Sequence, residues 1–184
     1  KQRFVILENE FGEMNFDAGR LRHREDSEEP AITVEEVTEG CICCSMNLDF
    51  SLSVLAIANN FEPDVLIVEA SGVALLGRLI QEVSPILYER IGLLEPITIL
   101  DAENYRRNLR DFPTYLKDPI AHAGTILVSR SETWTPADFR SLRSELEIPD
   151  TIRIPESHYG YWRDHEFEEL LRRPLEIEGK VQAY

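Results

Sequence analysis

Basic residues and long apolar runs are both scarce in this sequence of 184 residues. Only 19 Lys and Arg stand against 34 Asp and Glu, which gives a formal net charge of -15. Without a basic stripe we expect no nucleic-acid partner, because binding to the phosphate backbone depends on clustered Lys and Arg. The longest apolar runs have about five to eight residues, the length of strands, so we expect no membrane span.

A disulfide framework and a recognisable signal peptide are also missing. The chain has three cysteines within four residues, and Cys43 and Cys44 are neighbours. The odd count and this crowding exclude a set of ordinary disulfides. We therefore predict a protein of the reducing cytoplasm. The chain opens at Lys1 without Met and runs almost directly into a strand, so we expect a fragment whose upstream part is absent.

The cysteine cluster is the most informative stretch, because Gly40 precedes Cys41, Cys43 and Cys44 in the pattern Cys-x-Cys-Cys. Thiolates beside carboxylates are ligands that zinc and neighbouring transition metals accept. Glu8 and Glu13 follow the first apolar run and are the expected carboxylate partners. Alternatively, the cluster is a reduced turn with buried cysteines, since free Cys is among the most buried residue types.

The four histidines fall in no ligand spacing, and we expect them not to bind the metal: His23, His122, His158 and His165. The aromatic residues that follow His158 are expected to cover an edge of the sheet.

Short apolar runs alternate with helical stretches along the chain. We expect strands at residues 4–7, 31–37, 65–68, 96–100, 125–128 and 151–155, and helices beginning near residues 49, 75, 103, 135 and 164. This order predicts an α/β fold with a mostly parallel β-sheet and helices on both faces, a Rossmann-like arrangement of three layers. Ligands of such sheets bind at the carboxyl ends of the strands.

Polar residues end three of the later strands. Glu69 and Gly72 can place a carboxylate on Mg²⁺ and let the backbone approach a phosphate, or they can form an ordinary strand-to-helix turn. Asp101 has the same two interpretations, with a turn or cap role favoured. Residues 129–132 end the fifth strand. We expect all these strand ends to meet at one edge of the sheet.

In order and separation, four segments resemble the CobW-like branch of the metal-trafficking P-loop GTPases: residues 8–13, 40–44, 69–72 and 100–102. The resemblance covers about residues 4–132 and implies a P-loop GTPase-like domain of a metallochaperone or metal insertase. It assigns metal binding, of Zn²⁺, Co²⁺ or a related ion, to Cys41, Cys43, Cys44, Glu8 and Glu13. It places Glu69 and Gly72 near Mg²⁺ and the γ-phosphate of GTP.

Two departures from the family pattern stand out. No G-x-x-x-x-G-K-[ST] phosphate-binding loop is found in these residues; in the family that loop precedes the segment beginning at Lys1. The Asn-Lys-x-Asp that reads guanine is replaced by Ser129, Arg130, Ser131 and Glu132. Ser129, Arg130, Glu132 and Asp101 are therefore the expected nucleotide contacts, with relaxed guanine preference. Alternatively, the chain is a metal-binding module with a degenerate nucleotide site and no catalysis.

By the same resemblance, we expect residues 1–155 to form the nucleotide-binding domain. Residues 156–184 are expected to form a helix and a tail leading toward a possible second domain. The expected partner is a client metalloprotein, and homo-oligomers bridged by a shared metal are possible.

Overall fold

The computed structural model describes residues 3–8, 32–36, 49–88 and 90–177. The chain divides into two compact units. The described helices and strands are, in chain order, β1 (Phe4–Glu8), β2 (Ile32–Glu36), α2 (Asp49–Phe61), β3 (Val65–Glu69), α3 (Leu76–Val83), η1 (Ser84–Ile86), β4 (Ile97–Asp101), α4 (Tyr105–Asp111), α5 (Pro113–His122), β5 (Thr125–Ser129), α6 (Pro136–Glu145), η2 (Tyr159–Tyr161) and α7 (Asp164–Leu170).

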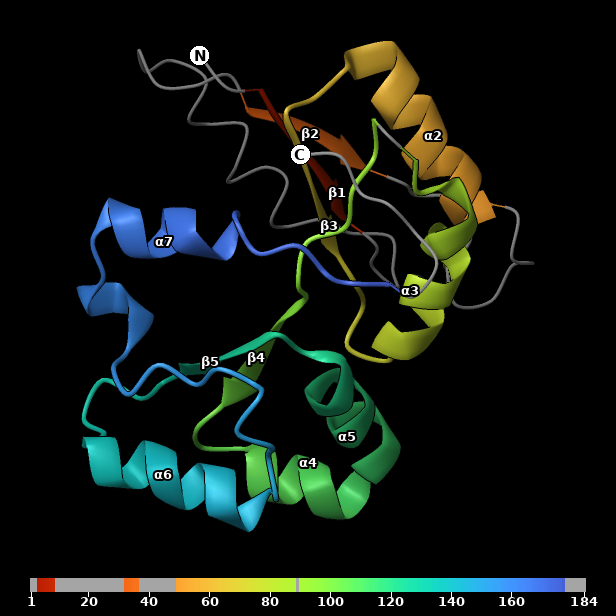
Figure 1. Cartoon of the computed structure of the whole chain (residues 1–184). Coiled ribbons are helices and arrows are strands. Elements are labelled where there is room, and N and C mark those ends of the chain that lie inside the picture. Colours follow the sequence, from red (N-terminus) through yellow and green to blue (C-terminus); the bar gives the residue numbers. More distant parts are fainter. Residues whose placement is uncertain (1–2, 9–31, 37–48, 89, 178–184) are drawn as a thin grey trace. The chain divides into compact units, whose positions relative to one another are not determined.

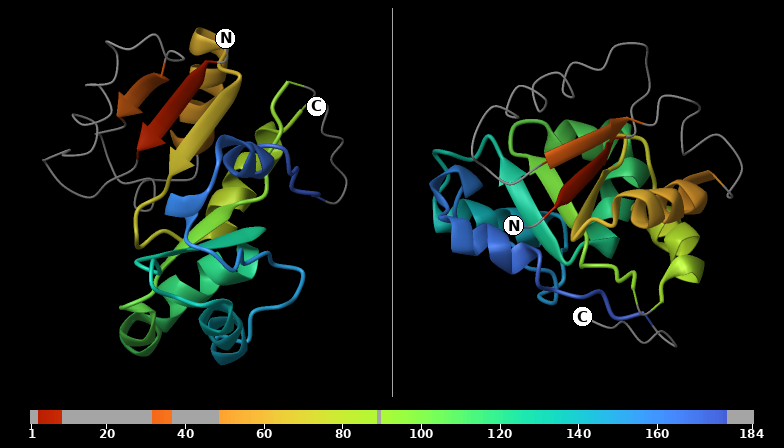
Figure 2. Two further views of the ribbon diagram at one scale, coloured as in Figure 1. Left: turned by 90° about the vertical axis from the view of Figure 1, so that its left-hand side faces the viewer. Right: turned by 90° about the horizontal axis from the view of Figure 1, so that it is seen from above.

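The first unit contains a parallel sheet with the strand order β2-β1-β3 (Figure 2). Phe4 is in register with Ile32 on one side and with Val65 on the other. Val5 and Leu7 are buried, because the central strand β1 has a neighbour along each edge. Parallel pairing of this kind brings the carboxyl ends of all three strands to the same edge.

The strand at 65–68 is confirmed. A sheet with helices on both faces predicts that the side chains of this strand are buried, and for two of them this is wrong. Ile67 and Val68 are exposed, at 41% and 36%. The reason is position: among the described strands, β3 pairs only with β1 and forms an edge of this sheet. In α2 the apolar spacing holds for Phe50, Val54 and Ile57, which are buried.

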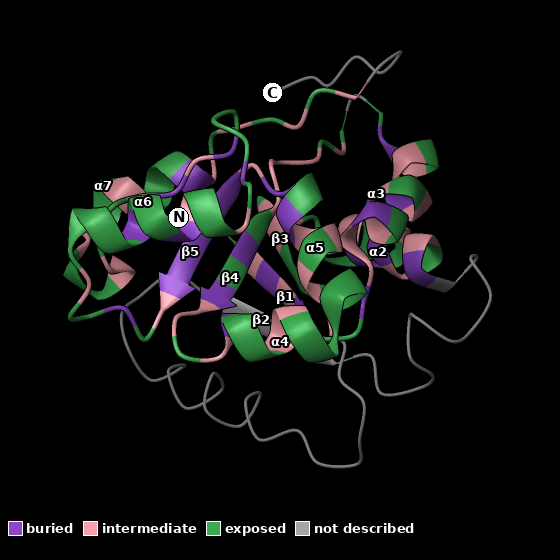
Figure 3. Ribbon diagram, turned by 90° about the horizontal axis from the view of Figure 1, so that it is seen from below, coloured by how far each residue is buried: buried purple, intermediate pink, exposed green. Residues whose placement is uncertain are grey.

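The second unit is built on β4 and β5, which pair in parallel with Ile97 opposite Thr125. Strand β5 is buried along almost its whole length (Figure 3). Within this unit α4, α5 and α6 lie to one side of the two strands and α7 lies to the other (Figure 1). The core that holds these elements together includes Leu100, Ile126, Phe139 and Leu142.

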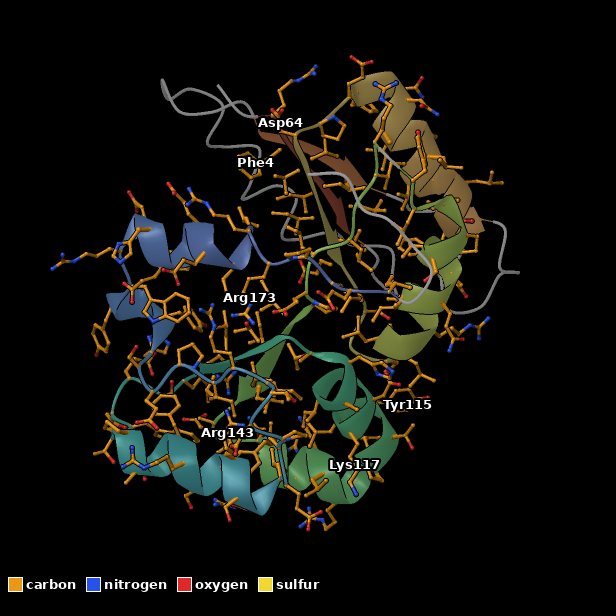
Figure 4. All side chains as sticks on the ribbon, viewed as in Figure 1. Phe4, Asp64, Tyr115, Lys117, Arg143 and Arg173 are labelled. Atoms are coloured by element: carbon orange, nitrogen blue, oxygen red, sulfur yellow. The ribbon has the colours of Figure 1, made fainter. Side chains whose placement is uncertain are left out.

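Helix α6 is fixed at both ends, and it begins directly after the loop that follows β5. At its start, the Thr135 backbone N–H and hydroxyl both donate to the Asp138 carboxylate at 2.7 Å, forming a capping box. Near its end, the Arg143 guanidinium (labelled in Figure 4) donates to the carbonyl oxygens of Pro149 and Ile152. Charge-assisted hydrogen bonds of this kind are stronger than neutral ones.

Two expectations from the sequence require correction. The strand expected at 151–155 is reduced to a single parallel bridge between Thr125 and Arg153. Pro149 and Pro155 lie on either side of the bridge, and proline has no N–H with which to extend a ladder. Helix α5 was not among the helices expected from the sequence, and it carries a proline in its interior, Pro119.

Among the described residues, no helix combines the length and the apolar character that a membrane crossing requires.

Candidate functional site

Glutamates end each of the three parallel strands in the first unit. Glu8 of β1 is the register partner of Glu36 in β2 and of Glu69 in β3. Neighbouring strands are about 4.8 Å apart, so the backbones of these three glutamates lie side by side at one edge of the sheet. Glu8 was predicted as a metal ligand and Glu69 as a group near Mg²⁺, and their backbones are now adjacent.

The turn after β3 is open. Glu69 and Gly72 are both exposed, and a Cβ added to Gly72 would meet nothing within 4 Å. The turn closes through a hydrogen bond from the Ala74 N–H to the Ser71 carbonyl oxygen at 2.9 Å. An exposed carboxylate and an unobstructed glycine backbone fit Mg²⁺ and a phosphate respectively, because the cation prefers oxygen ligands.

In the second unit, Asp101 and Ser129 are register partners at the ends of β4 and β5. The Asp101 carboxylate accepts hydrogen bonds from the Glu103 N–H at 2.9 Å and from the Asn104 side-chain amide at 2.8 Å. The Arg130 guanidinium lies 3.2 Å from the same carboxylate. These contacts match the turn role and orient the carboxylate within the β4–α4 connection.

The pKa of Asp101 reflects opposing effects. Desolvation by burial raises it, but the hydrogen bonds from Asn104 and Glu103, together with the positive charge of Arg130, lower the pKa below its usual value. The anion is therefore the favoured form in the folded protein.

Ser129 is the last residue of β5 and residues 130–132 follow it, and the polar groups of these residues are engaged within the protein. The hydroxyl of Ser131 is buried and donates to the Val128 carbonyl oxygen at 2.7 Å. Arg130 has a backbone φ of 56°, in the left-handed region that residues other than glycine seldom adopt. Its guanidinium lies 3.1 Å from Glu103, in addition to the contact with Asp101.

Glu132 has neighbours that the sequence did not suggest. Its carboxylate lies 3.6 Å from His158 Nε2, and its carbonyl oxygen accepts a hydrogen bond of 3.4 Å from the Tyr161 hydroxyl. These residues are 26 and 29 positions further along the chain, so no local pattern connects them with Glu132. The aromatic run after His158 was the only available signal.

Cys41, Cys43, Cys44 and Glu13 lie outside the described residues. Within the part of the chain that the structure describes, no group of three or more His, Cys, Asp or Glu could hold a metal. The predicted metal site therefore stays a prediction from the sequence. Glu8 is the one predicted ligand whose backbone the structure describes.

We expect Asp101→Asn to lower the free energy of unfolding by about 1.5–3 kcal/mol at pH 7, the usual range for hydrogen bonds to a charged group. Because folding lowers the pKa of Asp101, this stabilisation is present above the unfolded-state pKa of about 3.9. It is lost as the pH falls through the folded-state pKa, so the difference from wild type should shrink below about pH 4. Urea unfolding at several pH values measures it.

The control for Asp101→Asn is Asp150→Asn, because the Asp150 side chain is fully exposed and its nearest cation, Arg143, is 3.7 Å away. We expect little change for this variant. Equal losses for both variants, or a difference that does not depend on pH, would contradict the role given to Asp101.

Comparison with known proteins shows the family to which the chain belongs. The model of the CobW/HypB/UreG nucleotide-binding domain matches residues 1–150. The zinc chaperone YjiA of Escherichia coli (strain K12) is 27% identical over 137 residues, which cover 71% of this chain and 41% of YjiA. Zinc-regulated GTPase metalloprotein activator 1 of Dictyostelium discoideum is 34% identical over 70 residues, covering 38% of this chain and 13% of that protein.

Among solved structures, the Zn(II)-bound YjiA GTPase from E. coli aligns with a TM-score of 0.50 at 22% identity, over 79% of this chain and 54% of the other. At this identity the likeness shows the fold. The chain spans about half of the length of YjiA and a smaller part of the protein from D. discoideum. With the family model matched over residues 1–150, this chain belongs to the CobW/HypB/UreG nucleotide-binding domain family and has the α/β fold of its P-loop GTPases.

Proposed function

We propose that this chain is the nucleotide-binding domain of a zinc metallochaperone that couples GTP hydrolysis to delivery of the ion to a client metalloprotein. The observation that carries the proposal is the pairing of Glu8 with Glu69 on adjacent parallel strands, within a chain of this family. The first residue belongs to the predicted metal site and the second to the predicted nucleotide site. Metal binding at the end of one strand could therefore affect the nucleotide site at the end of its paired neighbour.

The metal is the cargo, and its proposed ligands are the thiolates of Cys41, Cys43 and Cys44 with the carboxylates of Glu8 and Glu13. Soft sulfur beside hard oxygen suits an ion that must be held and then released. Zinc is favoured over cobalt because YjiA is a zinc chaperone and the protein from D. discoideum is a zinc-regulated activator.

For the nucleotide, we propose that Glu69 and Gly72 face Mg²⁺ and the γ-phosphate. Asp101, Ser129, Arg130 and Glu132 are the proposed contacts on the base side. Mg²⁺ would neutralise the charge that develops on the phosphate oxygens. The exposed Glu69 carboxylate would orient the attacking water, and the open backbone at Gly72 would allow close approach of the phosphate.

A second function, metal binding without catalysis, has one observation in its favour. Arg130 is paired with both Asp101 and Glu103, and the Ser131 hydroxyl is bonded to Val128. A nucleobase that approached this loop would have to compete with those internal contacts.

The metal site is tested by the double substitution Cys43→Ser and Cys44→Ser. We expect zinc affinity, measured by competition with a chromophoric chelator under reducing conditions, to fall at least about 100-fold, because two thiolate ligands are lost. The control is His165→Ser, which removes an exposed residue of a metal-binding type that the sequence predicts not to be a ligand. Unchanged affinity in the double variant would overturn the metal assignment.

The nucleotide site is tested by titrating the complete protein with GTP and Mg²⁺ in a calorimeter and by measuring phosphate release. We expect saturable binding, and for Glu69→Gln a loss of hydrolysis of about 100-fold or more with binding retained, the usual effect of removing a group that positions water. Asp64→Asn, directly before the amino end of the same strand (Figure 4), is the control and should leave hydrolysis unchanged.

Absence of GTP binding by a folded protein that still binds zinc would favour the metal-binding module without catalysis. Equal hydrolysis by wild type and Glu69→Gln would remove Glu69 from the mechanism while leaving the nucleotide site in place.

A further inference from the structure

The loop around η2 fixes the orientation of the His158 imidazole ring. His158 Nδ1 accepts a hydrogen bond from the Gly160 backbone N–H at 3.0 Å. A Cβ added to Gly160 would lie 2.8 Å from the same nitrogen, so only glycine permits this close approach. The imidazole side chain is only 10% exposed.

This hydrogen bond determines the tautomer. Because Nδ1 acts as an acceptor, the proton of the neutral imidazole must be on Nε2. Nε2 is the atom that faces Glu132, 3.6 Å from Oε1. That distance is long for a hydrogen bond, so the attraction between the N–H and the carboxylate is mainly electrostatic.

Aromatic contacts keep the ring in place. The Tyr159 ring lies against His158 with centroids 4.3 Å apart and planes tilted by 30°. Tyr161 meets the imidazole edge-on at 5.9 Å, and its hydroxyl donates to the Glu132 carbonyl oxygen at 3.4 Å. The loop therefore contacts both the backbone and the side chain of Glu132.

The contacts with His158 and Tyr161 restrict Glu132, whose side chain is otherwise more mobile than that of the aspartate expected at this position. Glu has one more rotatable bond than Asp, so its carboxylate loses more conformational entropy when it is fixed for recognition. A donor that attracts the carboxylate before the ligand arrives reduces that cost at the moment of binding. Arg130, two residues earlier, is drawn instead toward Asp101 and Glu103.

We propose that His158 is a positioning residue for nucleobase recognition, which directs the Glu132 carboxylate toward a base with two adjacent N–H donors. This inference rests on the proposed nucleotide-binding function. An ionised carboxylate only accepts hydrogen bonds, so it can pair with the N1–H and the 2-amino group of guanine. Hypoxanthine has the N1–H but no 2-amino group, so it can form only one of these two hydrogen bonds.

Two substitutions separate the parts that the imidazole plays. In His158→Asn, the side-chain oxygen can still accept from the Gly160 N–H, but the amide is too short to reach Glu132. In His158→Gln, the amide nitrogen can take the place of Nε2–H. The ratio of GTP to ITP affinity is the readout, because the two nucleotides differ only in the 2-amino group.

For wild type we expect GTP to bind roughly 10- to 100-fold more tightly than ITP, the range for one hydrogen bond to a charged group. His158→Asn should bring GTP affinity close to that of ITP, with a smaller loss of ITP affinity, because hypoxanthine keeps the N1–H donor. His158→Gln should keep most of the preference. The matched control, His165→Asn, lies on α7 outside this loop and should keep all of it.

A preference that survives in His158→Asn, or that is lost equally in His158→Gln and His158→Asn, overturns the role of His158 while the nucleotide site stands. A wild-type protein that binds neither nucleotide overturns the proposed nucleotide site, and the role of His158 with it. A readout without nucleotide is the long-range ¹H–¹⁵N spectrum of the imidazoles, where we expect the Nε2–H tautomer for His158. The Nδ1–H tautomer would contradict the proposal.

Discussion

Parallel strand pairing is the constraint on which the rest of this structure depends. In each unit the register brings functional candidates together in pairs: Glu8 with Glu69 in the first and Asp101 with Ser129 in the second. A parallel ladder cannot shift by one residue without moving its buried side chains to the opposite face. The burial of Val5 and Leu7 in β1 thereby also fixes which residues end the strands side by side.

The loops at these ends differ in how much of their chemistry is already used within the protein. Around Gly72 the backbone is open, and the Glu69 side chain is exposed. Around residues 129–132 almost every polar group has an internal contact, from the buried Ser131 hydroxyl to the paired Arg130. Under the proposed function, phosphate and Mg²⁺ would meet an open turn, whereas a nucleobase would meet a loop whose polar groups already have partners within the protein.

The fold class could be predicted from the sequence, because alternating apolar runs and helical stretches are local signals. The match to the family model confirms the predicted α/β fold. Prediction from the sequence failed where tertiary context decides. Ile67 is exposed because β3 is an edge among the described strands, and α5 forms despite Pro119. Neither fact can be read from residue spacing.

For the candidate site, the strand-end residues could be predicted, since parallel sheets expose their carboxyl ends. The contact of His158 with Glu132 could not, because 26 residues separate the two and only the folded chain joins them. The thiolate site remains a prediction, based on the spacing of Cys41, Cys43 and Cys44.

The most direct measurement is a Co²⁺ titration of the reduced, metal-free protein, followed by its near-ultraviolet absorption. Thiolate ligation produces a charge-transfer band in that region. The account predicts a band that saturates with Co²⁺ and disappears when Zn²⁺ is added. No band from a folded protein whose three thiols are confirmed free would contradict it and would return the cysteines to a structural role.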